Sequence, residues 1–409
     1  MNGLVEPADR ACEVLVAGTG LAGLTAAIAF AQAGFDVVSC GADERTALGR
    51  TVAMLDRTVA YLDSLGLWPA IRADAAPMRT LRIVDDTGAL FPPRPVEFKS
   101  SEIGLETFGW NVENNRMADA LAAHAAKTAG LERRRPVVAR YDFTGDDFTG
   151  DLATAELDDG RRVESALVIG ADGRNSRARR SAGLEARVKP YPQSALTALL
   201  AHRLPHNDAS TEFHTRQGPF TLVPLPARGS APHRSSLVWL MSEEEARRRE
   251  ALEDAGLERE IERQARSLLG AVRLEGRPGV FPMARQIVPT IASRRLALVG
   301  DAAHAFPPIG AQGLNLGLRD VEAIVALALE ARTEGRDIGG EAVLRQYERA
   351  RRADIAMRTG AVHGLNQALL TRFAPVDFAR GAGLAALGAI GPLRRFVMRR
   401  GVAPGLAHR

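Results

Sequence analysis

Three short apolar runs, each followed by a turn that contains glycine, predict buried strands at 14–17, 166–169 and 296–299. The first and third turns lead into small or apolar residues with helical spacing, so helices are expected at about 24–33 and 316–331. Strands that alternate with helices in this way indicate an α/β fold.

The pattern between these segments predicts a second sheet. Residues 81–91 have the pattern of a hairpin, and 194–241 contains several short strands with a break rich in proline and glycine at 224–232. Helices are expected at about 243–255 and 257–269. Because a chain of 409 residues exceeds a usual single core, two domains that share an interface are expected.

The turn after the first strand has the spacing of a dinucleotide-binding motif. Gly18 permits the tight turn, Gly20 lets a pyrophosphate approach the backbone, and Gly23 lets the helix pack closely on the strand. The alternative is a glycine-rich turn in another α/β fold. The strand before the motif and the helix after it favour dinucleotide binding.

The acid that usually binds the ribose is missing from its expected position. That position, about 20 residues after the glycines, holds Gly41. Asp43 and Glu44 follow closely and reach the ribose if the strand end is displaced. The ribose contact is therefore left unassigned.

The third strand leads into an acid and then into a glycine-rich helix start. Asp301, after Gly300, is placed to accept hydrogen bonds from hydroxyl groups. Free N–H groups near Gly313 and Asn315 stabilise a developing anion. A polyol attached to a ring that becomes anionic suits both features, and reduced flavin is such a ligand.

The second strand ends in Asp172-Gly173, a common turn dipeptide. The order of the three motifs along the chain nevertheless resembles the single-component flavin-dependent aromatic hydroxylases. Finer matches narrow the resemblance to the hydroxylases of ubiquinone biosynthesis. These matches lie at 50–55, 62–68, 102–114, 220–225 and 313–320, and the resemblance covers nearly the whole chain.

The resemblance implies a cofactor site for FAD. In that family the Asp-Gly motif touches both FAD and the reducing nicotinamide, and the Gly-Asp aspartate holds the flavin ribityl chain. Asn114 departs from the family pattern, in which many members have an arginine, and Gly310-Ala311 stands where a small residue followed by glycine is more usual. The cofactor-binding residues expected from the motifs and the resemblance are Gly18, Gly20, Gly23, Arg50, Asn114, Asp172, Gly173, Gly300, Asp301, Pro308, Gly313, Leu314 and Asn315.

The implied architecture is a Rossmann-like FAD-binding domain with an inserted mixed β-sheet substrate domain and a helical C-terminus. Substrate is expected to bind between the two domains, where the second sheet roofs the flavin ring. The expected boundaries are 1–78, 112–182 and 278–345 for the FAD-binding domain, 79–111 and 183–277 for the substrate domain, and 346–409 for the C-terminal region.

The implied reaction uses NADPH or NADH to reduce FAD and transfers one oxygen atom of O2 to an electron-rich aromatic carbon. The protein must position the substrate, stabilise charge on the flavin and exclude water. The apolar residues expected either to exclude water or to form plain sheet core are Phe220, Leu222, Val223, Leu225 and Trp239.

No catalytic base is assigned. His304 follows the Gly-Asp motif and either transfers a proton or hydrogen-bonds the backbone around a cofactor loop. Arg50 is either a flavin-domain contact or an ordinary solvated arginine. No metal ligands are assigned, because Cys12 and Cys40 are expected to be buried free thiols rather than a disulfide or a metal site.

The sequence pI of about 9.4 does not indicate nucleic-acid binding. Arginine replaces lysine almost throughout, since only Lys99, Lys127 and Lys189 are present. The start of the chain lacks the plan of a signal peptide and no run of 18 apolar residues occurs, so a cytoplasmic protein is expected.

The C-terminal part is basic, with twelve arginines against three acids from 342 to 409. These residues carry a net charge of +9. Because the whole chain carries +4, the remaining residues carry −5. Leu393, Phe396 and Val397 share one helical side, and the arginines at 394, 395, 399 and 400 stay polar. A helix peripheral at the inner membrane face and a helix packed on the flavin domain both fit this pattern.

The sequence therefore predicts an FAD-dependent monooxygenase acting on a polyprenylated phenol of ubiquinone biosynthesis, with membership of a quinone-biosynthesis complex as a further expectation. Two alternatives stay open. One is an aromatic hydroxylase of secondary metabolism. The other is a non-hydroxylating flavin-binding subunit of a lipid-biosynthesis complex, and its main support is Gly41.

Overall fold

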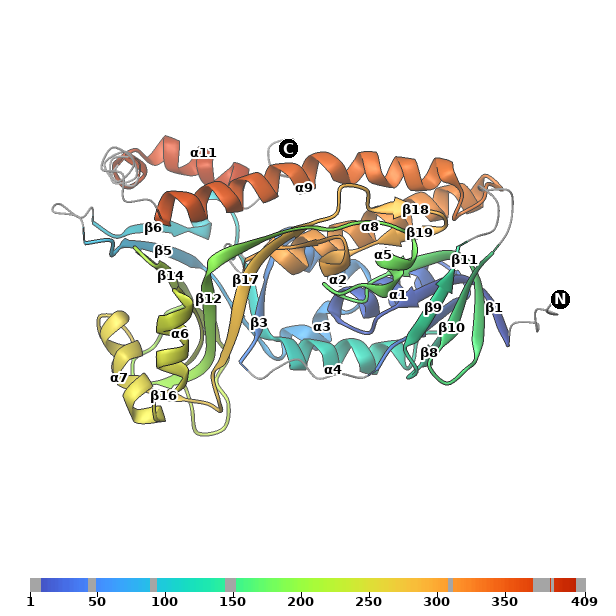
Figure 1. The fold of residues 1–409 in the computed structure, drawn as a ribbon. Coiled ribbons are helices and arrows are strands. Elements are labelled where there is room, and N and C mark those ends of the chain that lie inside the picture. Colours follow the sequence, from blue (N-terminus) through green and yellow to red (C-terminus); the bar gives the residue numbers. More distant parts are fainter. Residues whose placement is uncertain are drawn as a thin grey trace.

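The computed structural model describes residues 9–42, 49–88, 94–143, 152–307, 312–370, 383 and 386–401. These residues form two large sheets and one small sheet along an elongated molecule, with the first sheet at one end and the second at the other (Figure 1). The α/β class is as predicted.

The first sheet has eight strands. They are β1 (Arg10–Ala17), β2 (Val37–Cys40), β8 (Leu131–Arg134), β9 (Val138–Asp142), β10 (Ala153–Leu157), β11 (Arg162–Gly170), β18 (Ala292–Ser293) and β19 (Leu296–Leu298). Their order is β18-β19-β11-β1-β2-β8, with β10 and β9 continuing from β11. Strands β19, β11, β1, β2 and β8 are parallel, as in a dinucleotide-binding domain.

Helices pack on this sheet: α1 (Leu21–Gln32), α4 (Asn114–Ala125), α5 (Arg177–Ser181), α8 (Gln312–Thr333) and the 3₁₀ helix η2 (Gly300–Ala302). Helix α1 packs on β1, β2 and β11, with α4 and α8 on either side of it. Helix α8 begins at Gln312, four residues before the predicted start. Gly313 is tolerated in its first turn, where the backbone N–H groups have no intrahelical partner.

The second sheet has nine strands. They are β5 (Thr80–Asp85), β6 (Val96–Lys99), β12 (Arg187–His202), β13 (Ala209–Thr215), β14 (Gly218–Leu225), β15 (Arg234–Met241), β16 (Val272–Leu274), β17 (Gly279–Ile287) and β20 (His304–Ala305). Their order is β20-β17-β12-β15-β14-β13-β5-β6, and β16 pairs with β12.

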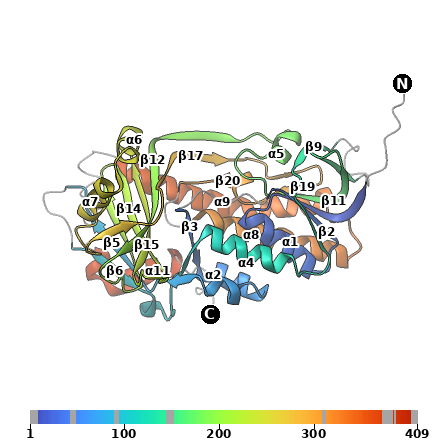
Figure 2. The ribbon, with the colours of Figure 1, turned by 90° about the horizontal axis from the view of Figure 1, so that it is seen from below.

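Two helices, α6 (Glu243–Glu250) and α7 (Asp254–Gln264), cover one side of the second sheet (Figure 2). Both are shorter than predicted. Helix α7 stops at Gln264 because Arg266 and Ser267 have positive φ angles of 51° and 52°, which a helix does not allow.

The hairpin predicted at 81–91 is confirmed only in its first strand. Strand β5 pairs with β6, which begins at Val96, and it pairs in parallel with β13 on its other side. Residues 89–93 lie outside the described residues. The partner strand therefore comes later in the chain than the local pattern indicated.

A small third sheet joins the two large ones. It contains β3 (Thr51–Leu55), β4 (Ala75–Pro77) and β7 (Gly109–Glu113), and near it lie α2 (Asp56–Ser64), α3 (Trp68–Arg72) and the 3₁₀ helix η1 (Ser100–Ile103). Strand β3 contacts α8, and β4 and β7 contact β14. The third sheet thus contacts the second sheet directly and contacts helix α8 of the first sheet's helical layer.

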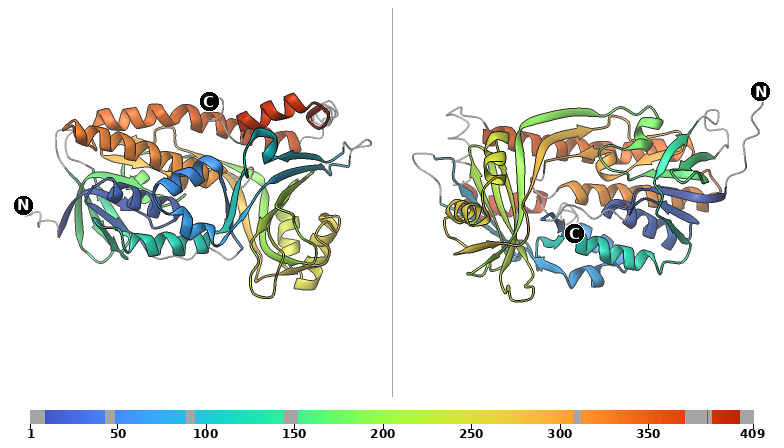
Figure 3. Two further views of the ribbon diagram at one scale, coloured as in Figure 1. Left: turned by 180° about the vertical axis from the view of Figure 1, so that it is seen from behind. Right: turned by 60° about the horizontal axis from the view of Figure 1, so that its bottom comes forward.

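The long helix α9 (Glu341–Leu370) runs along one side of the molecule and contacts both β18 and β14, and α11 (Gly391–Gly401) lies beyond it near β6 (Figures 1 and 3). The domain boundary expected at 345/346 falls inside α9. Tyr347 is fully buried, and its hydroxyl donates to the carbonyl of Leu298 at 2.7 Å, so the start of α9 packs with the first sheet.

Strand β17 also departs from the expected boundaries, because it pairs with β12 in the second sheet although 278–345 was assigned to the FAD-binding domain.

Cys12 and Cys40 are buried free thiols as expected, and burial raises the pKa of each thiol to about 12. No helix in the described part of the chain combines the length and apolar character needed to cross a bilayer.

Candidate functional site

The three motifs singled out in the sequence meet at one edge of the first sheet. Ala17 at the end of β1 is the register partner of Gly170 at the end of β11, and Gly170 is the partner of Leu298 at the end of β19. Ligands of open α/β sheets bind outside the carboxyl ends of parallel strands. This edge is therefore the candidate site.

The three motif glycines have different surroundings. Gly18 has a φ of +113°, and an added Cβ would lie 2.3 Å from the carbonyl oxygen of Ala171. An added Cβ at Gly23 would lie 2.0 Å from the carbonyl oxygen of Gly18. At Gly20, however, an added Cβ meets nothing within 4 Å. Gly18 and Gly23 are thus required by the fold, whereas the open space at Gly20 fits a pyrophosphate at the start of α1.

Gly41 directly follows β2, as the sequence indicated, and the position has little room for a side chain. An added Cβ would lie 3.0 Å from side-chain atoms of Thr19, whose hydroxyl donates to the carbonyl of Ala42 at 2.6 Å. Asp43 and Glu44, the alternative ribose acids, lie outside the described residues.

Asp172 has both a structural contact and a free acceptor. Its Oδ2 accepts the backbone N–H groups of Arg177 at 2.7 Å and Ala178 at 3.1 Å at the start of α5. Its Oδ1 is buried and has no hydrogen-bond partner among the described residues. Gly173 has a φ of +77°, and an added Cβ would meet open space. One carboxylate oxygen therefore fixes the turn and the other is available to a ligand.

Asp301 lies on η2 with its side chain half exposed, and the Nε of Arg174 is 3.5 Å from its carboxylate. The guanidinium of Arg50 lies over the ring of Phe281 in β17, with the central carbon 4.7 Å from the ring centroid. Burial, and then the charge of Arg174, lower the pKa of Arg50, while Asp301 opposes the shift. Arg50 is therefore not an ordinary solvated arginine: it packs against the second sheet close to Asp301.

The start of α8 supplies backbone groups rather than side chains. Asn315 is buried; its Oδ1 accepts the N–H of Leu55 and its Nδ2 donates to the carbonyl of Ala53, each at 2.8 Å. That side chain holds β3, so it is not available for the predicted anion contact. An added Cβ at Gly313 meets nothing within 4 Å. Leu314 is half buried against the core, and Pro308, Gly310 and Ala311 lie outside the described residues.

Asn114 is the first residue of α4, and its backbone N–H donates to the carbonyl of Arg50 at 3.0 Å. Its side-chain Oδ1 is buried without a hydrogen-bond partner within the described ranges. Asn114, the residue that departs from the family pattern, thus lies beside Arg50, and its side-chain oxygen can accept a hydrogen bond from a ligand.

His304 is fully buried, and its Nε2 lies 2.6 Å from Oδ2 of Asp320. The expected bond to a backbone group is wrong for this nitrogen, because the partner is a side-chain carboxylate. The ring also stacks on Phe306, with the centroids 5.3 Å apart. A fully buried imidazole fits packing beside the cofactor turn better than proton exchange with a substrate.

Phe220, Leu222 and Trp239 do not face the flavin domain. They lie in one core cluster with Ala246 of α6 and Leu257 of α7, on the far side of the second sheet. Because side chains alternate along a strand, Val223 and Leu225 belong to the opposite face. The plain-core alternative is therefore correct for Phe220, Leu222 and Trp239.

The face turned toward the third sheet is partly polar. The hydroxyl of Ser236 accepts bonds from Thr51 Oγ1 at 2.9 Å and Asn111 Nδ2 at 3.2 Å. Ser236 is the register partner of Leu199, so Thr197, two residues earlier, shares this face. Thr197 is 7% exposed, and its hydroxyl has no hydrogen-bond partner in the described part of the chain.

Sequence reasoning missed Arg174, Thr197 and Asp320. Arg174 follows the Asp-Gly turn directly, and Asp320 interrupts the buried apolar side of α8 formed by Gly317, Val321 and Ile324. A charge at a core position was the available signal for Asp320. Thr197 is the one polar residue in the apolar run 195–201, but threonine is common in strands, so the signal was weak.

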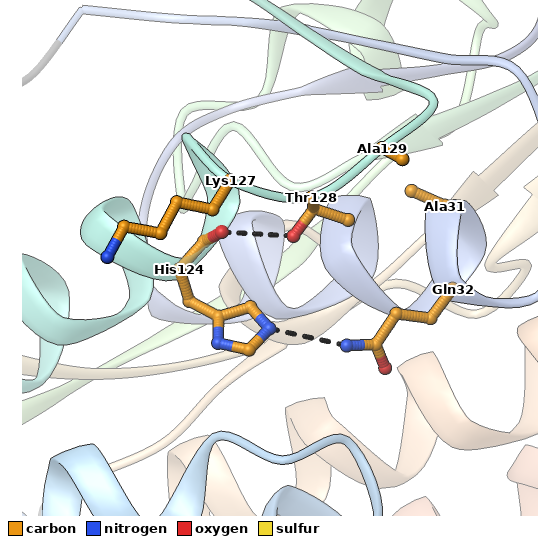
Figure 4. A pocket seen from close by; sticks show the side chains of 6 residues that line it. All are labelled: Ala31, Gln32, His124, Lys127, Thr128 and Ala129. Atoms are coloured by element: carbon orange, nitrogen blue, oxygen red, sulfur yellow. Dashed lines mark hydrogen bonds between the residues drawn. The ribbon is translucent and has the colours of Figure 1, made fainter.

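A pocket of about 360 Å³ lies elsewhere, between the C-terminal ends of α1 and α4 (Figure 4). Gln32 and His124 face each other across it, with Nε2 atoms 3.3 Å apart, and Thr128 donates to the carbonyl of His124 at 3.0 Å. Because Gly20 is at the opposite end of α1, this pocket is not the cofactor site.

Comparison with known proteins gives the same assignment. The family model described as "FAD binding domain" matches residues 11–359. The chain is 33% identical to the ubiquinone hydroxylase UbiL of Rhodospirillum rubrum over 96% of this chain and 90% of that protein. It is 30% identical to the 3-demethoxyubiquinol 3-hydroxylase of Escherichia coli, over 96% and 98% of the two chains.

Among solved structures, the p-nitrophenol 4-monooxygenase PnpA of Pseudomonas putida has the same fold, with a TM-score of 0.76 and 22% identity over 95% of this chain and 97% of that one. The match to the family model, which covers most of the chain, agrees with the glycine turn and the open space at Gly20. The protein belongs to the FAD-dependent monooxygenases, and its cofactor is FAD.

Proposed function

We propose that this protein hydroxylates the aromatic ring of a polyprenylated phenol in ubiquinone biosynthesis, with NAD(P)H as reductant and O2 as the source of oxygen. In this reaction the phenol, O2, NAD(P)H and a proton give the hydroxylated phenol, NAD(P)+ and water. The observation that carries the proposal is the meeting of three cofactor motifs at one sheet edge, beside the second sheet. The named activities of the two curated relatives support the substrate class.

Bound FAD supplies the electron transfer and the oxygen activation. The protein's own residues have other tasks. The open backbone at Gly20 would bind the pyrophosphate, Asp301 would bind the ribityl hydroxyls, and the N–H groups at the start of α8 would stabilise negative charge on the flavin ring. The face of the second sheet that carries Thr197 would bind the substrate ring.

The direct test is to delete the gene and identify by mass spectrometry the quinone precursor that accumulates. Accumulation of a precursor that lacks one ring hydroxyl is expected. An unchanged quinone pool would contradict the substrate assignment. A purified yellow protein whose NADPH oxidation is stimulated by a prenylated phenol separates this function from the non-hydroxylating subunit and, by substrate preference, from a secondary-metabolite hydroxylase.

Asp301→Ala is expected to lose about 1.5–3 kcal/mol of FAD affinity, the range for hydrogen bonds to a charged group. The substitution also leaves Arg174 without the carboxylate that lies 3.5 Å away. Titration of the apoprotein with FAD measures the loss. Asp301→Asn keeps an acceptor and should bind FAD more tightly than Asp301→Ala; unchanged affinity in both variants would contradict the assignment.

Thr197→Val is expected to raise the KM for the phenol about 3- to 10-fold, because a neutral hydrogen bond contributes about 0.5–1.5 kcal/mol. The change removes a buried hydroxyl that has no partner among the described residues and alters little volume. Steady-state kinetics gives the KM. The control is Thr211→Val: Thr211 is also buried, but it pairs with Leu222 on the other face of the sheet. Equal KM values in both variants would remove Thr197 from the substrate site.

Membrane contact is a separate part of the proposal. Helix α11 packs on the second sheet rather than on the flavin domain: Met398 is buried with Phe98 and Ile103, and Arg394 pairs with Glu102 at 2.8 Å. Its outer side exposes Leu393, Phe396 and Val397 by 39%, 55% and 42%. An apolar side with flanking arginines supports contact with an anionic bilayer, where a prenylated phenol resides.

Replacing Leu393, Phe396 and Val397 together by serine should weaken binding to anionic liposomes at least about 10-fold, because a buried apolar side chain contributes about 1.5–3 kcal/mol. Sedimentation with liposomes at low salt measures it. Turnover of a short-chain soluble phenol should stay at the wild-type value. Arg394 is left in place because it pairs with Glu102. Equal sedimentation of variant and wild type would mean that α11 serves only the packing of the second sheet.

A further inference from the structure

Asp320 is a carboxylate in the core of the cofactor domain, on the side of α8 that faces η2. Its side chain is fully buried, and both of its oxygens lie within hydrogen-bond distance of donor groups. A buried charge is stable only when it is paired and hydrogen-bonded. The identity of its partners shows what this charge holds in place.

Two of the partners belong to the turn that carries Asp301. Oδ2 accepts the backbone N–H of Gly300 at 3.1 Å and lies 2.6 Å from Nε2 of His304. One oxygen therefore binds the residue before Asp301 and a residue three positions after it. The 300–304 segment cannot change conformation without breaking a hydrogen bond to Asp320.

The same turn is pressed against α8 one helical turn earlier. Gly300 has a φ of +59°, and an added Cβ at Gly317 would lie 3.0 Å from the Cα of Gly300. Gly317 and Asp320 are three residues apart and share one side of α8. Close backbone contact at Gly317 and hydrogen bonds at Asp320 thus fix the turn at two points.

The third partner comes from another helix. Oδ1 of Asp320 accepts the Nε of Arg351 at 2.8 Å, and Arg351, in α9, is 6% exposed. Arg351 also pairs with Asp354 at 2.9 Å. The guanidinium balances the charge of Asp320 through the other carboxylate oxygen, so α9 is connected to the cofactor turn through one carboxylate.

We propose that Asp320 is a positioning residue for FAD: it holds the 300–304 turn in the conformation that presents the Asp301 carboxylate to the cofactor, and Arg351 of α9 holds Asp320 in place. Asp320 itself does not touch the cofactor. This role concerns FAD binding alone and is independent of which phenol the enzyme hydroxylates.

The test is Asp320→Asn, which keeps the size of the side chain but removes its charge and turns one acceptor into a donor. FAD titration of the apoprotein should give a Kd at least 10-fold above wild type. Hydrogen exchange of the 296–307 segment in the apoprotein should be faster than in wild type, which is a readout that does not require bound FAD. Wild-type values in both measurements would overturn the proposal.

Glu258→Gln is the matched control. Glu258 is also a buried carboxylate that accepts a backbone N–H, from Leu274 at 3.0 Å, and an arginine, Arg273, at 2.8 Å, but it lies in α7 of the other domain. The Glu258→Gln substitution should lower the melting temperature without changing the Kd for FAD. If both variants raise the Kd equally, loss of FAD reflects general destabilisation and the positioning role is wrong.

If Asp320→Asn does not fold, Arg351→Met and Arg351→Lys decide the question. The Met variant removes the positive charge beside Oδ1 and should raise the Kd for FAD at least 5-fold. The Lys variant restores a charge and should bind FAD within 2-fold of wild type. Equal Kd values in Met, Lys and wild-type proteins would overturn the link to α9 and to Asp320. Failure of wild type to bind FAD would instead contradict the cofactor assignment.

Discussion

Gly20→Val is expected to give a folded protein that binds FAD at least about 100-fold more weakly. An added Cβ at Gly20 meets nothing within 4 Å, and the backbone there is extended, with φ −69° and ψ 177°, which valine readily adopts. The fold therefore has room for the valine side chain. That side chain would, however, occupy the space in which a pyrophosphate would lie at the start of α1. Losing two hydrogen bonds to a charged group, at about 1.5–3 kcal/mol each, corresponds to at least this factor.

Flavin content after purification and FAD titration of the apoprotein measure the effect. The matched control is Gly23→Val in the same motif, where the added Cβ would lie 2.0 Å from the carbonyl oxygen of Gly18. That variant should lose the fold itself, as seen by circular dichroism and thermal unfolding. Normal flavin content in Gly20→Val would refute the placement of the pyrophosphate.

Arg234→Met is expected to lower the free energy of unfolding by about 3–5 kcal/mol, the cost of breaking a buried ion pair by removing one partner. Arg234 is 1% exposed and binds Glu275 at 2.6 Å, Glu113 at 2.9 Å and the carbonyl of Pro226 at 3.1 Å. Methionine fills similar space but removes the cation that pairs with Glu275, while Glu113 keeps a second cation, Arg228, at 3.0 Å. Because Glu113 ends β7, the loss should also loosen the third sheet from the second.

Denaturant unfolding of the apoprotein measures this effect. Arg248→Met is the control: Arg248 pairs with Glu260 at 2.7 Å, but its side chain is 43% exposed. An exposed pair contributes about 0–1 kcal/mol. Equal losses in the two variants would mean that burial of Arg234 adds nothing, and the network would then be no more than a surface ion pair.

The cofactor edge was predictable because each part of it is local in the sequence. A buried strand, a glycine with positive φ and the following helix lie within a few residues at Gly18 and again at Gly300. Parallel strands bring their carboxyl ends to one edge whatever lies between them in the chain. The placement of Asp172 and Asp301 at that edge follows from the same rule.

The face of the second sheet was not predictable in the same way. Alternation separates Phe220 and Leu222 from Val223, but it does not say which set faces the flavin domain. The answer depends on α6 and α7, whose side chains Ala246 and Leu257 cover one face. The face against those helices is apolar, whereas the other face mixes apolar residues such as Val223 with polar ones such as Ser236.

The contacts of Asp320 with Gly300 and Arg351 also could not be predicted from the hydrophobic pattern of the sequence. They join residues 20 and 31 positions apart through side chains. Docking of α11 on η1 is a contact of the same kind. From the sequence alone, Arg394 would be taken for a solvated arginine, because its partner Glu102 lies 292 positions earlier in the chain. Local pattern gives elements and turns, whereas such pairs depend on how the elements pack.

The strand order of the first sheet has a consequence for biosynthesis. The glycine turn at 18–23 leaves the ribosome early, but β19 and Asp301 follow 278 to 283 residues after Gly18. At about 5–20 residues per second, the two halves of the cofactor site are separated by roughly 15–60 s of translation. A nascent chain that ends before residue 296 lacks one of the three strands whose ends meet at the site. Capture of FAD is therefore a late event, and until then residues 168–170 at the end of β11 lack their partner strand and form a short exposed edge.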